Sequence, residues 1–324
     1  MTVVIPEEPV TSVAPLAKPR RKKAPAAQHS VGVTRGGWFV HIAILVVVLI
    51  WLIPTMGVLV TSFRPQALST RTGWWSVIAH PFRGGEWTIE NYRTVLSAQG
   101  FKNAFLNSVA VAVPSTVIPI TIAAFAAYAF SWMEFRGRHV MFVLVVGLMV
   151  VPLQMALIPI LRMYNSGWTI AGTKVFPDLN LNGTFLGIWL AHTGFGLPLA
   201  TYLLRNYIGS LPSSIIESAK IDGADHFTIF WRLIVPLSVP ALAAFAIFQF
   251  LWVWNDLLVA YVFLGATSRT RVVTIALNNL VGSHGEDWYL LTSAAFVSMV
   301  LPLVVFFSLQ RYFVRGLTAG SVKG

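Results

Sequence analysis

The sequence predicts an all-α integral membrane protein with six transmembrane helices and both termini in the cytoplasm. Three observations support this prediction. Hydrophobic residues make up 56% of the 324 positions and charged residues 11%, whereas ordinary soluble domains carry about 25% charged residues. Six apolar segments are long enough to cross a bilayer, which takes roughly 20 residues. The short basic segments all fall on one side if every apolar segment spans, and that side is expected to be cytoplasmic.

The six apolar segments are expected to be helices, because a backbone in hydrocarbon must satisfy its polar groups within the segment. They cover residues 38–61, 107–132, 140–161, 184–204, 233–264 and 289–309. Only the fifth carries a charged residue, which is Asp256. Prolines inside the segments are expected to kink the helices without preventing them from spanning. External loops are then expected near residues 64–106, 162–183 and 265–288.

The orientation is predicted from basic residues next to the apolar segments, such as Arg136, Arg138, Arg232 and Arg315. The long first external loop also contains Lys and Arg, which weakens this signal without reversing it. Residues 1–37 are rich in Pro, Ala and Lys and are predicted to form a disordered basic cytoplasmic tail. A cleavable signal peptide is not expected, because the following apolar run is too long and no small-residue cleavage site follows it.

The net charge of +11 raises the question of nucleic-acid binding, but the sequence has no basic stripe interleaved with aromatic residues. Membrane orientation explains the basic residues better, so no nucleic-acid partner is expected. The chain has no cysteine, which excludes disulfides and thiolate metal sites. The histidines show no metal-ligand spacing, and no Gly-rich phosphate loop with a following Lys occurs. We therefore expect no cofactor, no metal and no catalytic residue.

The longest polar interruption in the second half of the chain lies within residues 209–232 and is predicted to form two short helices at a membrane surface. Ser214 and Glu217 fit a capping box, in which each side chain satisfies a free backbone amide. Asp222 and Gly223 are typical of a helix end, because glycine tolerates the left-handed conformation that closes a helix. Asp225 is expected to cap the second helix. Small residues around the bend allow another protein surface to approach closely.

This stretch resembles the EAA motif of permease subunits from binding-protein-dependent ABC importers. The matching residues are Glu217-x-Ala219, Asp222-Gly223-Ala224, an aromatic at Phe227 or Phe230, and Ile234-Val235-Pro236. Ser218 departs from the family, which usually has Ala there, but a small residue replaces a small one. In that family the loop is the coupling helix that docks into a groove of the ATPase subunit. The resemblance thus assigns ATPase coupling to Glu217, Ser218, Ala219, Asp222, Gly223 and Ala224.

The resemblance covers nearly the whole chain from Trp38 onward. Over this length the sequence is similar to the second permease subunit of maltose-type carbohydrate importers. Further matching runs are Thr61-Ser62-Phe63-Arg64-Pro65, Thr88-Ile89-Glu90-Asn91-Tyr92, Asn107-Ser108, Ala127-Tyr128-Ala129-Phe130, Phe135-Arg136-Gly137-Arg138, Trp254-Asn255-Asp256 and the C-terminal residues 310–324. In the maltose system a similar tail reaches into the interface between the ATPase subunits. By resemblance, residues 38–315 form a permease domain with the type I ABC importer fold, and residues 316–324 form a tail that contacts the ATPase through Gly316, Thr318, Gly320 and Lys323.

Five polar residues in or near the apolar segments are candidates for the translocation pathway. They are Gln154, His192, Gln249, Asn255 and Asp256. Asp256 lies about 23 residues into its segment, or ~35 Å along a helix, close to the far membrane face. A structural role at an external gate is therefore favoured for Asp256 over a role in transport. Packing and hydrogen bonding between helices are likewise favoured over sugar binding for His192, Gln154 and Gln249.

The function favoured by these features is a non-enzymatic permease subunit of a sugar importer, with a di- or oligosaccharide or a glucoside as substrate. The implied partners are a homologous second permease subunit, two ATPase subunits that hydrolyse ATP, an extracytoplasmic sugar-binding protein and the bacterial cytoplasmic membrane. The alternative is an ion-coupled secondary carrier or channel. Such proteins usually show intramembrane charge relays or inverted repeats, and a peripheral Asp is the only charge within these segments.

Overall fold

The structure is a computed structural model of the chain and describes residues 37–81, 84–265, 267–281 and 287–319. The chain divides into two compact units, residues 1–51 and 52–324, and the boundary between them falls inside the first helix. Apart from Gly37, the predicted N-terminal tail lies outside the described residues, as does the end of the predicted C-terminal tail, residues 320–324.

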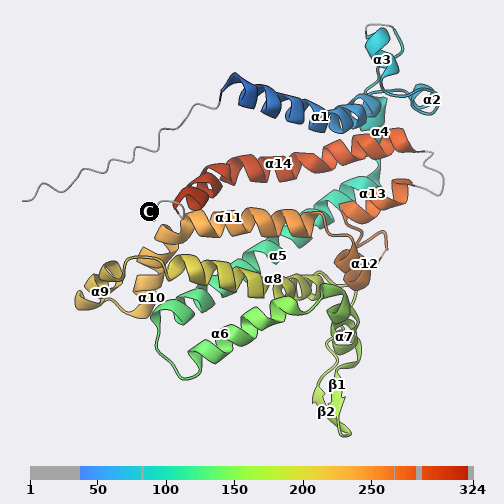
Figure 1. Cartoon of the computed structure of the whole chain (residues 1–324). Coiled ribbons are helices and arrows are strands. Elements are labelled where there is room, and N and C mark those ends of the chain that lie inside the picture. Colours follow the sequence, from blue (N-terminus) through green and yellow to red (C-terminus); the bar gives the residue numbers. More distant parts are fainter. Residues whose placement is uncertain (1–36, 82–83, 266, 282–286, 320–324) are drawn as a thin grey trace, which may run out of the picture. The chain divides into compact units, whose positions relative to one another are not determined.

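The described residues are mainly helical (Figure 1). The longer helices are α1 (Trp38–Ser62), α5 (Gln99–Trp132), α6 (Arg138–Gly147), α7 (Leu153–Ser166), α8 (Phe185–Ile208), α11 (Val235–Trp254) and α14 (Trp288–Ala319). The shorter helices are α2 (Gln66–Ser69), α3 (Ser76–Ala79), α4 (Glu90–Ser97), α9 (Ser213–Ile221), α10 (His226–Ile229), α12 (Leu258–Leu264) and α13 (Val273–Val281). A 3₁₀ turn, η1 (Leu148–Val150), follows α6, and a π-helical turn, η2 (Phe230–Ile234), joins α10 to α11.

Several of these helices are suited to cross a bilayer. Among the described residues, four are long and apolar enough, and a bent pair makes a fifth. The four are Trp38–Ser62, Gly100–Trp132, His226–Trp254 and Trp288–Tyr312, and the bent pair is Arg138–Val150 with Leu153–Ser166. The prediction of a helical, multi-pass membrane protein is confirmed. The predicted fourth segment corresponds to α8, whose residues Ile188, Ala200 and Leu204 are completely buried.

Two predicted helices are interrupted. The third segment bends by 105° between η1 and α7, because Pro152 has no amide hydrogen and restricts Val151 to an extended conformation. The fifth segment ends at Trp254, and Asp256 therefore lies in a break and not inside a helix. The Asn255 side chain donates a hydrogen bond to the Leu251 carbonyl at the end of α11 (2.7 Å). The Asp256 carboxylate accepts hydrogen bonds from amides in the first turn of α12.

The sequence did not predict the antiparallel hairpin of β1 (Trp168–Ile170) and β2 (Thr173–Phe176) in the second expected external loop. Its two-residue turn has positive φ at both Ala171 (50°) and Gly172 (81°). This is the type I′ geometry, whose twist matches that of the flanking strands.

The expected first external loop is folded around Arg64, whose side chain is 1% exposed. Its guanidinium donates to the carbonyls of Thr72 (3.0 Å) and Gly73 (2.9 Å) and lies 3.7 Å from Glu86. The Asn91 side chain donates to the Arg64 carbonyl (2.8 Å). Arg64, which belongs to the Thr61–Pro65 run that matches the permease family, therefore organises the loop.

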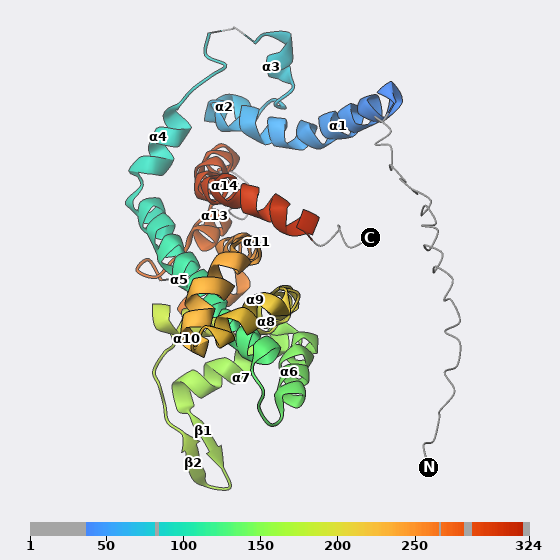
Figure 2. The same ribbon diagram turned by 90° about the vertical axis from the view of Figure 1, so that its left-hand side faces the viewer.

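Helices α5, α8 and α11 pack side by side in the second unit (Figures 1 and 2). One buried cluster lies among these three helices and α12, and it includes Ile188, Val253 and Phe263. A second cluster joins α5, α8 and the start of α11 to the loop helices through Ile216 and Phe230. The polar interruption is thus anchored directly to the central helices.

Two prolines inside α5 deprive backbone carbonyls of their helical donors, because proline has no amide hydrogen. Pro114 leaves the Ala110 carbonyl without its usual donor, and the indole of Trp189 on α8 donates to it instead (2.8 Å). Pro119 does the same at Ser115, whose carbonyl accepts from the side-chain amide of Gln249 on α11 (3.2 Å). Neighbouring helices therefore replace both lost hydrogen bonds.

Candidate functional site

The bend between α9 and α10 has the backbone geometry predicted from its sequence. Gly223 adopts a left-handed conformation with φ of 80°. Its amide donates to the Lys220 carbonyl (3.0 Å), and the Ala224 amide donates to the Ala219 carbonyl (2.9 Å). These two bonds define a Schellman motif, in which the last free carbonyls of a helix are satisfied by the residues that end it. The bend is consequently fixed by backbone hydrogen bonds.

The start of α9 differs from the prediction of a capping box. The helix begins at Ser213, one residue before Ser214, and Pro212 occupies the cap position without a side-chain hydrogen bond. The Pro212 carbonyl accepts the first helical bond, from the Ile215 amide (3.2 Å). Ser214 is therefore already inside the first turn, where its side chain cannot act as the cap. Glu217 is exposed.

The predicted cap of the second helix is confirmed. The Asp225 carboxylate accepts a hydrogen bond from the Thr228 amide at the start of α10 (3.0 Å). Hydrogen bonds from Thr228 hold the pKa of the Asp225 carboxyl below its usual value. Asp225 is therefore charged at neutral pH, which favours its position at the positive end of a helix.

The loop has one anchored face and one exposed face. Ile216 is 2% exposed and belongs to the buried cluster below the loop, and Ala219 and Ala224 pack against the same cluster. Ile221 and Phe227 point outward, with 86% and 66% of their surfaces exposed. The remaining predicted coupling residues, Glu217, Ser218, Asp222 and Gly223, are also exposed.

From the sequence, Ile221 has no predicted role, and Phe227 is only one of two possible aromatic matches to the family motif. Large apolar side chains in an exposed, otherwise polar loop often mark a surface that another protein covers. Their sequence signal is present but weak: both are apolar residues inside the polar interruption.

The five candidates for the translocation pathway fall into two places. Gln154 is exposed on α7. The other four lie on α8, α11 and the break after α11, where His192 is 1% exposed and Gln249 is completely buried. The His192 Nε2 atom lies 3.9 Å from a carboxylate oxygen of Asp256.

The space between His192 and Asp256 is too small for a sugar. The two side chains and Ser108 are among the residues that line a cavity of about 10 Å³. Such a volume is close to the minimum needed for one water molecule. In this conformation, this part of the protein therefore offers no room for a carbohydrate.

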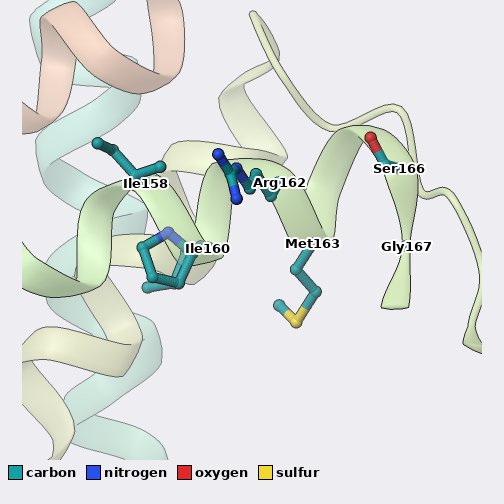
Figure 3. Close-up of a pocket in the computed structure, with 7 residues that line it drawn as sticks. Ile158, Ile160, Arg162, Met163, Ser166 and Gly167 are labelled. Atoms are coloured by element: carbon teal, nitrogen blue, oxygen red, sulfur yellow. The ribbon is translucent and has the colours of Figure 1, made fainter. Parts of the chain in front are cut away.

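A larger hollow of about 620 Å³ lies on the exposed side of α7. It is lined by Ile158, Pro159, Ile160, Arg162, Met163, Ser166 and Gly167. Figure 3 shows Ile158, Arg162 and Ser166 along one edge of the helix and Met163 on the opposite edge. All lining residues come from a single helix and the residue after it, so the hollow opens outward.

The remaining predicted residues lie at the C-terminus. Gly316 and Thr318 belong to the last turns of α14, which continues to Ala319. Gly320 and Lys323 lie outside the described residues. Within the part of the chain that the structure describes, no group of three His, Asp or Glu side chains is arranged to hold a metal ion.

These features define a helical, multi-pass membrane protein with an ordered polar loop attached to its central helices. The chain belongs to the family of binding-protein-dependent transport system inner membrane components, whose family model matches residues 119–319. It is accordingly a transport permease subunit. This result confirms the family resemblance found in the sequence.

Two similar proteins extend the match over most of the chain. The osmoprotective compounds uptake permease protein GgtD of Synechocystis sp. is 59% identical over 284 residues, which cover 88% of this chain and 91% of the relative. The alpha-glucoside transport system permease protein AglG of Rhizobium meliloti is 44% identical over 376 aligned positions, which cover 89% of this chain and 97% of the relative.

A solved structure has the same fold. It is a chain of a bacterial ABC transporter that imports the acidic polysaccharide alginate, with a TM-score of 0.67. The match covers 86% of this chain and 96% of that one at 20% identity.

Proposed function

We propose that this chain is one of two permease subunits of an ATP-driven importer for a glucoside or a di- or oligosaccharide. It forms half of the translocation pathway with a homologous permease subunit. Two ATPase subunits supply the energy, and an extracytoplasmic sugar-binding protein delivers the substrate. Family membership supports the binding-protein dependence. The substrate class is supported by the similarity to GgtD and AglG, an uptake permease for osmoprotective compounds and a transport permease for alpha-glucosides.

The observation that carries this proposal is the two-faced loop of α9 and α10. One face packs against the central helices through Ile216. The other presents Ile221 and Phe227 beside a rigid glycine bend. Exposed apolar residues on a preorganised element favour docking of another protein, because little conformational freedom is lost on binding. We assign this face to the ATPase, together with Glu217 and Ser218.

The proposed topology has six spans in the bacterial cytoplasmic membrane with both termini inside. The four long apolar helices and the bent α6–α7 pair supply five spans. We assign the sixth to α8, because its 24 residues are long enough to span a bilayer and it packs against the spanning helices α5 and α11. This topology places the α9–α10 loop and the tail at 316–324 on the cytoplasmic side, where the ATPase subunits bind. We propose that this tail also contacts them.

The glycine bend offers a direct test. Gly223 has φ of 80°, and an added Cβ meets no atom within 4 Å. Gly137, in the turn before α6, has φ of 82° and equally open space. Replacing either glycine by Val costs a similar backbone strain of about 1 kcal/mol or more. Only at Gly223 does the new side chain stand on the proposed docking face.

The experiment compares Gly223→Val with Gly137→Val in the importer reconstituted with its ATPase subunits and loaded binding protein. We expect Gly223→Val to lower ATPase co-purification and sugar uptake strongly at normal expression, and Gly137→Val to have a much smaller effect. If the Gly223→Val importer assembles and transports as well as the Gly137→Val importer, this loop is not the coupling element.

A further inference from the structure

Helix α5 carries two of the sequence runs that match the permease family, one with Asn107 and Ser108 and one with Tyr128. The proposed function gives these residues no role. We propose that α5 is a strut that transmits the movement of the ATPase-docking loop to the segment before α13. Tyr128 and Asn107 are its positioning residues. This inference rests on the proposed function and identifies the route by which the loop and the opposite end of the protein communicate.

At one end, α5 is joined to the second half of the loop. The Tyr128 hydroxyl and the Nδ1 atom of His226 on α10 are hydrogen-bonded at 2.8 Å, and Tyr128 is 4% exposed. Phe125, less than one turn earlier on α5, stacks on Phe230 of the π-helical turn with ring centroids 4.3 Å apart. Any displacement of α10 therefore acts directly on α5.

At the other end, α5 is joined to the segment that leads into α13. The side-chain amide of Asn107 donates to the carbonyls of Arg269 (3.0 Å) and Arg271 (2.9 Å). The next residue, Ser108, accepts a hydrogen bond from the amide of Val273, the first residue of α13 (2.8 Å). Three hydrogen bonds thus fix a distant loop to two consecutive residues of α5.

Between its two ends, α5 is hydrogen-bonded to a neighbouring helix at each of its two proline sites. Prolines commonly kink helices, and α5 contains Pro114 and Pro119. At each one the freed carbonyl is held by a side chain, from Trp189 on α8 or Gln249 on α11. The strut is therefore hydrogen-bonded to both neighbouring helices between Asn107 and Tyr128, which lie 21 positions or about 32 Å of helix apart.

A continuous, braced helix with hydrogen bonds at both ends makes a specific thermodynamic prediction. Substitutions that far apart normally have additive effects. If α5 transmits a signal as one body, breaking either end interrupts the same route, and breaking both adds little. Such non-additivity is the physical evidence for coupling that spatial position alone cannot supply.

The first experiment removes one atom, by Tyr128→Phe, in the complete importer reconstituted in proteoliposomes. The matched control is Tyr207→Phe, on α8, whose hydroxyl donates to the Leu237 carbonyl (3.3 Å). We measure ATP hydrolysis without binding protein and its stimulation by sugar-loaded binding protein. We expect Tyr128→Phe to reduce the stimulation roughly five-fold, the factor that one hydrogen bond of ordinary strength is worth, and to leave basal hydrolysis and assembly unchanged.

Tyr207→Phe should leave both quantities unchanged. A normal stimulation ratio for Tyr128→Phe overturns the inference, as does a parallel loss of basal and stimulated hydrolysis, which a merely structural role would cause. If the wild-type importer itself shows no stimulation, the proposed function fails and the inference fails with it.

The second experiment adds Asn107→Ala to Tyr128→Phe. The matched control for Asn107 is Asn103→Ala, an exposed position one turn away on the same helix. Ser108→Ala replaces Asn107→Ala if the latter does not assemble. We expect Asn107→Ala alone to reduce stimulation to a similar degree, and the double variant to be little worse than either single variant. Additive losses in the double variant, or an equal loss in Asn103→Ala, overturn the strut.

Discussion

The close approach of α8 and α11 at Gly196 gives a stability prediction with a defined sign. A Cβ at position 196 would lie 2.7 Å from Nε2 and 2.8 Å from Oε1 of Gln249. That amide is completely buried, and its Nε2 donates to the Ser115 carbonyl that Pro119 leaves without a helical donor. In Gly196→Ala, either the new methyl group is overpacked or the amide moves away and the carbonyl loses its donor.

Both outcomes have a similar cost. Overpacking a buried site costs about 1–3 kcal/mol, and a buried carbonyl without a partner costs about 1–3 kcal/mol. Replacing a helical glycine by alanine returns about 0.5–1 kcal/mol. Gly194 lies on the same helix, and a Cβ added there meets no atom within 4 Å. Gly194→Ala therefore shows the helix-forming gain alone, and the difference between the two variants isolates the strain.

The assay is reversible unfolding of the purified protein in mixed detergent micelles, with Gly196→Ala, Gly194→Ala and Gln249→Ala measured singly and Gly196→Ala repeated in the Gln249→Ala background. We expect Gly196→Ala to be about 1–3 kcal/mol less stable than Gly194→Ala. In the Gln249→Ala background the penalty should disappear, because the obstructing amide is gone. Equal stabilities for the two glycine variants, or a penalty that persists without Gln249, would refute this account of the contact.

The remaining predictions concern the topology and the tail. Because the chain has no native cysteine, single cysteines at the exposed positions Arg136 and Thr173 should react with an impermeant thiol reagent from opposite sides of the membrane; labelling of both from outside contradicts the six-span topology. Deleting residues 316–324 should lower the stimulation of ATP hydrolysis by loaded binding protein while leaving membrane insertion intact, and unchanged stimulation and sugar uptake would show that the tail does not contact the ATPase subunits.

The features that the sequence predicted correctly depend on local chemistry. Long apolar segments form helices because no other open structure satisfies its backbone in hydrocarbon. Gly223 ends α9 because glycine has no Cβ and adopts a positive φ readily, so this one residue suffices for the prediction. The cap at Asp225 is equally local, since it joins residues three positions apart.

The predictions that were wrong failed where two local signals compete. Ser214 and Glu217 have the spacing of a capping box, but Pro212 occupies the cap position two residues before Ser214. The apolar run over residues 233–264 continues through Asn255 and Asp256, yet these two side chains end one helix and begin another. Hydropathy averages over such pairs, so it extends the helix across the break.

The partners of the α5 carbonyls could not be predicted from the sequence at all. Proline shows which carbonyl loses its donor, but the replacement comes from Trp189 or Gln249, which are 79 and 134 residues away from the carbonyls they bind. Only the packing of α5 against α8 and α11 brings them together. The sequence therefore identifies the carbonyl that needs a donor but not the residue that supplies it.

The candidates for the translocation pathway also differ in whether they satisfy backbone groups. A polar residue in an apolar segment suggests function, but here three of the candidates satisfy backbone groups. Gln249 donates to the Ser115 carbonyl, Asn255 donates to the Leu251 carbonyl, and Asp256 accepts from the start of α12.

His192 differs from these three residues. Its imidazole is buried, and neither ring nitrogen has a hydrogen-bond partner among the described residues. The Asp256 carboxylate lies 3.9 Å from its Nε2 atom, and both side chains line a cavity close to the minimum size that holds one water molecule. His192 is thus the buried candidate whose position is not explained by a hydrogen bond to any described residue.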